Sequence, residues 1–229
     1  MLITNFENFE IKNSKNLICK HGLIILKNAN LTLETYENFV KKIGKLLVTE
    51  KHVLNNSKTI QEVSNVGLFR NHDVDWHNDW SYGRGNYFGT SLYNVKNADL
   101  AETQFIDMSK LPTTFYEIYK GKEAKYAPPK YLNYCFTEKQ ILLLEKQNIK
   151  RSMVFQHPVT KENILYCSPG TIQKPHDNLN KIINYIEKIC YCHKWEKNDL
   201  LLFDNLKMMH RRKSFIGDRI LWRIQFTLF

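Results

Sequence analysis

The sequence lacks any long hydrophobic run, and this argues against a helix that spans a membrane. Apolar runs such as residues 23–26 and 200–203 have the length of a strand, whereas a membrane-spanning helix needs about 20 apolar residues. The first residues also lack a basic segment followed by an apolar stretch, which is the pattern of a secretory signal. We therefore expect a cytoplasmic protein without a membrane partner.

Cysteine is scarce, and its count of five is odd. An odd count without a secretory signal favours reduced thiols over a disulfide framework. Cys190 and Cys192 stand beside His193, but this spacing matches no common zinc pattern. Because both cysteines follow an amphipathic stretch at residues 179–189, we expect them to pack as small apolar groups.

Dense basic tracts are also missing, although the chain carries a formal net charge of +10 and has a sequence pI near 9.3. The lysines are scattered and form no recognisable nucleic-acid-binding module, so nucleic acid is not a favoured partner. The charge nevertheless supports one alternative from another functional class, a non-catalytic basic binding module. Salt-sensitive binding to random duplex DNA, without affinity for iron, would favour that alternative.

The length of 229 residues suits a single domain that spans residues 1–229. The chain shows neither an internal repeat nor a linker or low-complexity tract. Residues 111–150 are the hardest to interpret, because Pro128 and Pro129 interrupt them. This segment is either a lid over a pocket or a surface connection.

Short strand-like stretches outnumber the helical ones. Amphipathic helices are expected at residues 32–44, where Thr32 can cap the start and Gly44 can end the helix, and at residues 179–189. Strands are expected at residues 21–26, 59–66, 87–95, 103–106, 152–156, 163–168, 200–203 and 219–229. This pattern predicts a mainly β fold with peripheral helices, built around an antiparallel barrel or jelly roll.

A close-set imidazole and carboxylate, His77 and Asp79, are the first candidates for a functional site. In an extended segment, residues two apart point the same way. Joined by the distant His210, they would form the two-histidine, one-carboxylate set of non-haem Fe(II) oxygenases. Because the chain has eight histidines, such a pair can arise by chance, and the interpretation depends on the other parts of the site.

The C-terminal stretch from 219 to 229 alternates strictly between two faces. Arg219 and Arg223 share one face, which either faces water or lines the interior of a barrel. An interior arginine would need an anionic partner, and its guanidinium fork matches a carboxylate. The opposite face carries Ile220, Trp222, Ile224, Phe226 and Leu228.

Taken together, these motifs resemble the TauD/TfdA family of Fe(II)- and 2-oxoglutarate-dependent dioxygenases. The strongest matches are residues 76–79 with 81–82, residues 199–205 leading to His210, and residues 217–219 leading to Arg223. Weaker matches at residues 157–160 and 21–24 occur in the same order, so the resemblance covers nearly the whole chain. It implies a double-stranded β-helix, which is a form of jelly roll.

Carried over residue by residue, the resemblance implies that His77, Asp79 and His210 bind Fe(II). Arg219 would pair with the distal carboxylate of 2-oxoglutarate, assisted by the hydroxyl of Thr103. Residues 99–102, directly before this threonine, depart from the glycines that are usual in the family. Arg223 would help to hold the acidic group of the substrate.

The resemblance also implies an enzyme that uses Fe(II), 2-oxoglutarate and O2 and releases succinate and CO2. Its substrate would be a small, anionic molecule bearing a carboxylate or sulfonate, with an unactivated C–H bond as the target. Asp79 fills the position that related halogenases leave for chloride, so hydroxylation is favoured over halogenation. Desaturation or oxidative rearrangement of an amino-acid-derived metabolite is the alternative. The sequence leaves the oligomeric state open, a homo-oligomer included.

Overall fold

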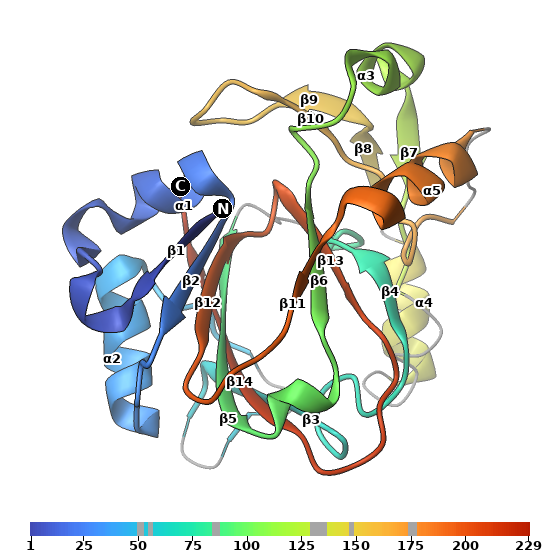
Figure 1. The fold of residues 1–229 in the computed structure, drawn as a ribbon. Helices are drawn as coiled ribbons and strands as arrows, with labels where there is room; N and C mark the ends of the chain where they lie inside the picture. The colour runs from blue at the N-terminus through green and yellow to red at the C-terminus, as the bar shows by residue number, and fades with distance from the viewer. Residues whose placement is uncertain (50–52, 55–56, 84–87, 129–136, 147–148, 174–177) are drawn as a thin grey trace.

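Two β-sheets face each other and are covered by helices on the outside (Figure 1). The computed structural model describes the chain except for residues 50–52, 55–56, 84–87, 129–136, 147–148 and 174–177. The larger sheet has six strands, in the order β1 (Leu2–Asn5), β2 (Leu23–Lys27), β12 (Leu200–Asp204), β5 (Phe88–Lys96), β14 (Ile220–Thr227) and β3 (Ile60–Ser64). The smaller sheet has four, in the order β11 (Tyr191–His193), β6 (Thr103–Asp107), β13 (Met208–Arg212) and β4 (Val74–His77).

Neighbouring strands are antiparallel within these two sheets, except for the parallel pair β1 and β2. Two short antiparallel pairs lie apart from them (Figure 1). They are β7 (Glu123–Lys125) with β8 (Lys150–Ser152), and β9 (Val154–Gln156) with β10 (Asn163–Leu165).

The larger sheet is apolar on both faces because each face packs against a different layer. In β12, Leu201 and Phe203 point into the core shared with the smaller sheet, whereas Leu200 and Leu202 point outward. The outward side chains pack against helices α1 (Ser14–His21) and α2 (Leu33–Ile43). Because the side chains of a strand alternate between its faces, the apolar residues 200–203 contribute to both hydrophobic cores.

The remaining helices surround the smaller sheet and the short hairpins (Figure 1). Helix α5 (Leu179–Ile189) places three buried side chains in the core that also contains Ile106 and Met209 of the smaller sheet. The other α-helices on this side are α3 (Thr113–Tyr119) and α4 (Glu138–Lys146). The 3-10 turns η1 (Phe6–Asn8) and η2 (Ile11–Asn13) instead lie with α1 and α2 beside the larger sheet, and η3 (Ala98–Leu100) follows β5. None of the helices in the described ranges is long and apolar enough to cross a membrane.

The prediction of a mainly β jelly roll with peripheral helices is confirmed. The Thr32 cap is also present, since its Oγ1 accepts a hydrogen bond from the backbone N–H of Thr35 at 3.2 Å. The single strand expected at residues 152–156 is wrong, because it divides into β8, which ends at Ser152, and β9, which begins at Val154. Met153 separates them, and its N–H bonds to Lys122 O while its C=O accepts from Tyr166 N.

The segment at residues 111–150, considered as a lid, is described only in part. Its described portion forms α3, β7 and α4 and the start of β8, while residues 129–136 and 147–148 lie outside the described residues. A lid function for this segment stays a prediction.

Candidate active site

The three residues expected to bind metal meet between the two sheets. His77 is the last residue of β4, and the antiparallel register of β13 places His210 directly opposite it, with ring centroids 4.3 Å apart. Asp79 follows in a turn. Its Oδ1 lies 3.6 Å from Nε2 of His77 and 3.9 Å from Nε2 of His210. One donor atom from each residue lies within 4.8 Å of the others.

The protonation of His77 makes this cluster suitable for a cation. Its Nδ1 lies 2.7 Å from the carbonyl oxygen of Asp75, and because a carbonyl can only accept, Nδ1 carries the proton. The lone pair of Nε2 then faces the Asp79 carboxylate, and this buried nitrogen has no hydrogen-bond partner among the described residues. Two lone-pair atoms that face each other in a buried site fit a shared metal ion.

The charges of the other two residues agree with this arrangement. Burial and the neighbouring His77 lower the pKa of His210 to about 3, so its imidazole is neutral near pH 7. Burial raises the pKa of Asp79, but the positive charge of Arg223, 2.6 Å away, outweighs this effect and holds the pKa well below its ordinary range. The site therefore offers two imidazoles and one carboxylate, which is the donor set that non-haem Fe(II) uses.

The second oxygen of Asp79 is held by the larger sheet. Its Oδ2 lies 2.6 Å from Nη2 of Arg223 and accepts longer hydrogen bonds from Gln225 (3.3 Å) and Thr90 (3.4 Å). Arg223 also donates from Nη1 to Oε1 of Gln61 at 2.9 Å. The sequence did not lead us to Thr90 or Gln225, although Gln225 shares the face of Arg223 by simple alternation.

His77, Asp79, His210 and Arg223 line a cavity that opens to solvent. Its apolar walls come from both sheets and from the loop before β4, where Phe69 lies 5.9 Å from the guanidinium of Arg223. The apolar lining residues are Val63, Phe69, Val74, Leu92, Phe203 and Leu221. A cavity that combines apolar walls with convergent polar and charged groups suits a small polar molecule.

Arg219, directly before β14, is fully buried. Its Nε donates to Ala98 O at 3.2 Å and its Nη2 to Ala101 O at 3.4 Å, while Nη1 has no hydrogen-bond partner within the described part of the chain. Burial and the charge of Arg212 lower the pKa of Arg219 to about 9, against an opposing effect of Asp99. A buried guanidinium with an open N–H face needs an anion. The strand therefore presents its arginines to the interior.

Thr103, at the start of β6, lines the same cavity. Its Oγ1 accepts a hydrogen bond from Nε1 of Trp195 at 3.0 Å. Because the indole N–H can only donate, the hydroxyl hydrogen of Thr103 can be donated to a second acceptor. The structure thus places Thr103 and Arg219 on the wall of one cavity.

Comparison with known families agrees with the fold and this geometry. Residues 3–225 match the model of the family described as taurine catabolism dioxygenase TauD, TfdA family. The chain belongs to the TauD/TfdA family. It is an Fe(II)- and 2-oxoglutarate-dependent dioxygenase, so the predictions of this enzyme class and of these cofactors are confirmed.

Individual relatives are distant. A 3-((Z)-2-isocyanoethenyl)-1H-indole synthase from Fischerella ambigua is 22% identical over 94% of this chain and 85% of the relative. The crystal structure of AAD-2 in complex with Mn(II) and N-oxalylglycine has a TM-score of 0.73 at 19% identity, covering 97% of this chain and 90% of that one. PvcB, an Fe, alpha-ketoglutarate dependent oxygenase from an isonitrile synthetic pathway, has a TM-score of 0.67 at 16% identity, with 97% and 82% coverage. At these identities the solved structures show a shared fold.

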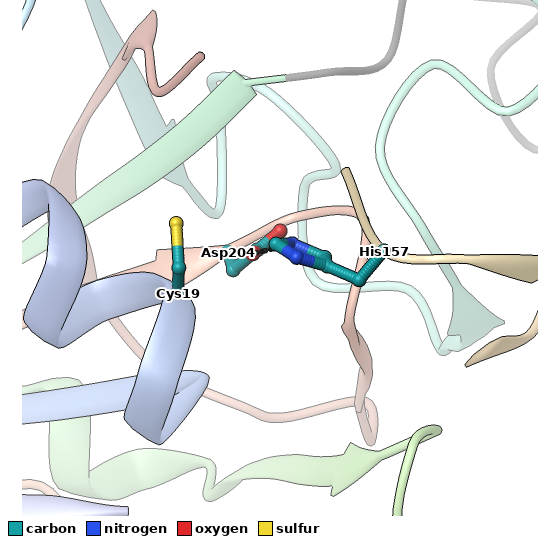
Figure 2. A group of neighbouring side chains, drawn as sticks. All are labelled: Cys19, His157 and Asp204. Carbon is teal, nitrogen blue, oxygen red and sulfur yellow. Dashed lines mark hydrogen bonds and ion pairs between the residues drawn. The ribbon is translucent and has the colours of Figure 1, made fainter. Parts of the chain in front are cut away.

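The dioxygenase contains a second buried cluster, formed by Cys19, His157 and Asp204 (Figure 2). Nδ1 of His157 accepts from the N–H groups of Val159 and Thr160, so the proton is on Nε2, which donates to Asp204 at 2.8 Å. Burial, then the charge of Asp204, raises the pKa of Cys19 to about 12 and keeps the thiol protonated. Both imidazole nitrogens are occupied by protein groups, so this cluster has a structural role.

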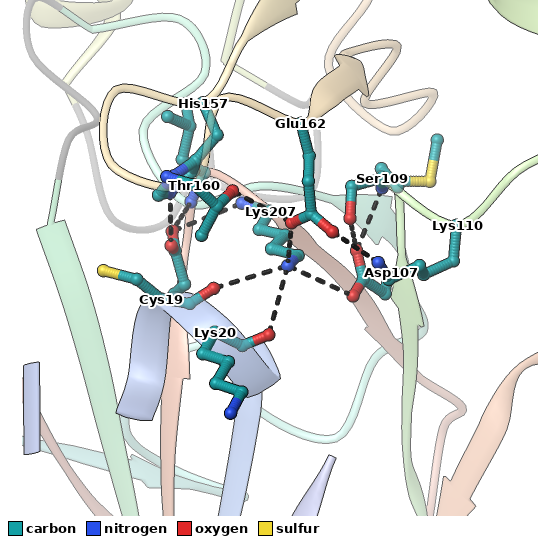
Figure 3. Close-up of polar contacts among 12 residues, drawn as sticks. Cys19, Lys20, Asp107, Ser109, Lys110, His157, Thr160, Glu162 and Lys207 are labelled. Carbon is teal, nitrogen blue, oxygen red and sulfur yellow. Dashed lines mark hydrogen bonds and ion pairs between the residues drawn. The ribbon is translucent and has the colours of Figure 1, made fainter. Parts of the chain in front are cut away.

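A fully buried lysine lies beside this cluster (Figure 3). Nζ of Lys207 is 2.6 Å from Glu162 and 3.6 Å from Asp107, and it donates to the carbonyls of Cys19 and Lys20 in the last turn of α1. A buried ammonium is tolerated when it is paired and hydrogen-bonded in this way. The turn between β12 and β13 is thereby fixed to α1, to the end of β6 and to the β9–β10 hairpin.

Replacing Glu162 by glutamine is expected to destabilise the protein near neutral pH, and to do so less in acid. Burial raises the pKa of Glu162, but hydrogen bonds from Lys110, Lys207 and Thr160 outweigh it and lower the pKa from 4.5 to about 2. The stabilisation from this carboxylate is therefore present above pH 4.5 and is lost as the pH falls toward 2. We expect a loss of about 1 kcal/mol, or roughly 2–4 °C in Tm, at pH 7. Thermal unfolding of both proteins at pH 7 and pH 3 tests this, and a difference independent of pH would contradict it.

Proposed function

We propose that His77, Asp79 and His210 hold Fe(II) on one face. The observation that supports this best is the buried Nε2 of His77, which has no hydrogen-bond partner in the described chain and faces Oδ1 of Asp79. Arg223, Gln225 and Thr90 occupy Oδ2 of the same carboxylate, so Oδ1 is the oxygen presented to the metal.

The distal carboxylate of 2-oxoglutarate is placed on Arg219 in this proposal. The buried, open N–H face of Arg219 supports it, because a guanidinium binds a carboxylate in a bidentate fork. The hydroxyl of Thr103, already oriented by Trp195, would donate a further hydrogen bond. The cosubstrate would then supply the negative charge that this arginine lacks in the protein.

The reaction we propose is hydroxylation of an unactivated C–H bond of a small anionic substrate, with release of succinate and CO2. Bound Fe(II) supplies the redox chemistry that couples oxidation of the substrate to decarboxylation of 2-oxoglutarate. The protein positions the substrate and determines the polarity of its surroundings. Phe69, Leu221 and the other apolar wall residues exclude water from the reacting carbon.

The charge of the cavity lining supports an anionic substrate. Its lining includes four arginines (Arg211, Arg212, Arg219 and Arg223), while Asp79 is the one carboxylate among the described lining residues. Arg223 has five N–H donors, and the bonds to Asp79 and Gln61 use two of them. The remaining donors of Arg223 are the groups that we propose for a carboxylate or sulfonate of the substrate.

A second outcome, desaturation or oxidative rearrangement of an amino-acid-derived metabolite, has support of its own. The relative from Fischerella ambigua is a synthase of an isocyanoethenyl indole, and PvcB comes from an isonitrile pathway. The mass of the product separates the outcomes, because hydroxylation adds one oxygen atom and desaturation removes two hydrogen atoms. An unchanged carbon skeleton with added oxygen supports our first proposal.

The test of the proposed function is anaerobic titration of the protein with Fe(II) and 2-oxoglutarate, followed by visible absorption. We expect a weak metal-to-ligand charge-transfer band that is absent in His77→Ala and weakened by loss of Arg219. Acidic small molecules should then be screened for stimulated release of succinate. Folded protein without such a band would contradict the proposed site, and a band without any substrate-stimulated succinate would contradict the proposed substrate class.

A further inference from the structure

The main chain of Asp79 lies outside the regular strand pairing. Strand β4 ends at His77, where it pairs with His210, and Asp79 lies in the turn that follows, next to Trp80 with φ of 55°. Asp79 is only 4% exposed. A buried N–H and C=O beyond the end of a strand must find partners other than the neighbouring strand.

The side chain of Asn205 supplies both of these partners. Its Oδ1 accepts from the N–H of Asp79 at 2.8 Å, and its Nδ2 donates to the C=O of Asp79 at 3.0 Å. These are the two bonds that a residue directly opposite in an antiparallel ladder would exchange with it. Asn78 closes the arrangement, because its Nδ2 donates to the C=O of Asn205 at 2.8 Å.

We infer that Asn205 is a positioning residue of the iron site, standing in for a strand neighbour so that Asp79 keeps a fixed place relative to His210. This inference rests on the proposed function, in which both residues bind the metal. Asn205 is not among the described residues that line the cavity. It acts through the main chain of a ligand, and such supporting contacts decide how well a metal site is preorganised.

The turn that carries Asn205 is itself held in place, which such a role requires. On one side of it, Asp204 accepts a hydrogen bond from His157, which lies beside it in Figure 2. Asp204 also accepts from the N–H groups of Leu206 and Lys207. On the other side, Lys207 joins α1 and the β9–β10 hairpin through the contacts shown in Figure 3. Strand β13 begins directly after this turn and carries His210. This anchored segment therefore positions two proposed metal ligands. It carries His210 directly, and it holds Asp79 through the side chain of Asn205.

The test compares Asn205→Asp with Asn94→Asp in the full chain, using Mn(II) alone as the probe. Aspartate at position 205 keeps the acceptor for Asp79 N but loses the donor to Asp79 O. Asn94 is a matched control, since it is also buried and its Nδ2 donates to a main-chain carbonyl, Glu196 O, at 2.7 Å. It does not line the cavity. Affinity is measured by calorimetry, and Tm and far-UV circular dichroism are recorded for each protein.

We expect Asn205→Asp to weaken Mn(II) binding by about 10- to 100-fold, the range found for groups that support metal ligands. Asn94→Asp should leave the affinity within about 2-fold even if its Tm falls equally, because its hydrogen bond does not reach a ligand. Equal weakening in both variants, or in neither, would overturn the inference. Wild-type protein that binds no Mn(II) would instead overturn the proposed metal site.

A measurement on the unaltered chain covers the case in which Asn205→Asp does not fold. Amide hydrogen exchange of metal-free wild type is expected to show Asp79 N–H protected as strongly as the ladder amides of β4. Exchange of that amide at the rate of an open loop would show that Asn205 does not hold it, and would overturn the inference.

Discussion

Asp79→Asn is expected to abolish iron-dependent succinate release and also to destabilise the metal-free protein by about 3 kcal/mol. The two effects have different causes. The first follows from loss of the anionic donor between His77 and His210. The second follows from the 2.6 Å contact between Asp79 Oδ2 and Arg223. Because both side chains are buried, removing one partner leaves the charge of the other uncompensated.

His77→Gln separates these two effects. It should remove metal binding just as completely, yet it leaves the pair of Asp79 and Arg223 intact, so the metal-free protein should lose less than about 1 kcal/mol. Urea unfolding of both variants and wild type, with metal chelated, measures the difference. Equal stability of Asp79→Asn and His77→Gln would show that Arg223 does not depend on Asp79 for its counter-charge.

Arg219→Met is expected to have opposite effects on cosubstrate binding and on stability. The KM for 2-oxoglutarate should rise by about 100-fold, since two hydrogen bonds to a charged group are lost at about 1.5 kcal/mol or more each. The ligand-free protein should become more stable by about 1 kcal/mol, because a buried guanidinium without a carboxylate partner is replaced by an apolar side chain.

Thermal unfolding with and without 2-oxoglutarate in the presence of Mn(II) tests this prediction. The wild-type Tm should rise on addition of the cosubstrate, whereas the higher Tm of Arg219→Met should not respond to it. Arg219→Lys provides the control, because it keeps the charge without the planar fork and should show an intermediate KM. A loss of stability in Arg219→Met would mean that its bonds to Ala98 and Ala101 outweigh the cost of the buried charge.

Features that depend on local pattern could be predicted from the sequence. The alternation of β14 places Arg223 and Leu221 on the inner face and Ile224 on the outer face, as the cores confirm. The set of His77, Asp79 and His210 was found because a short motif and one distant histidine follow the order of a known family. The structure brings their donor atoms together, although Asp79 reaches them from a turn rather than from the extended strand that the sequence argument assumed.

Features that depend on contacts distant in sequence could not be predicted in this way. Asp204 and Asn205 are equally consistent with an ordinary tight turn when the sequence is considered alone, and nothing in it shows that Asn205 meets Asp79. Lys207 is indistinguishable from the many surface lysines, yet it is fully buried. Its burial depends on Glu162 and Asp107, which only the tertiary fold brings beside it.

The strand order of the larger sheet also determines when the iron site can form as the chain is made. Strand β5 ends at Lys96, yet its two neighbours β12 and β14 begin only at Leu200 and Ile220. Until β12 has been synthesised, β5 has two open edges, and one of them stays open until β14 follows. Open edges are prone to pair with other chains. His77 likewise meets His210 only after β13, which pairs with β4, has been synthesised. The proposed iron site can therefore form only after β13, which carries His210, has been synthesised.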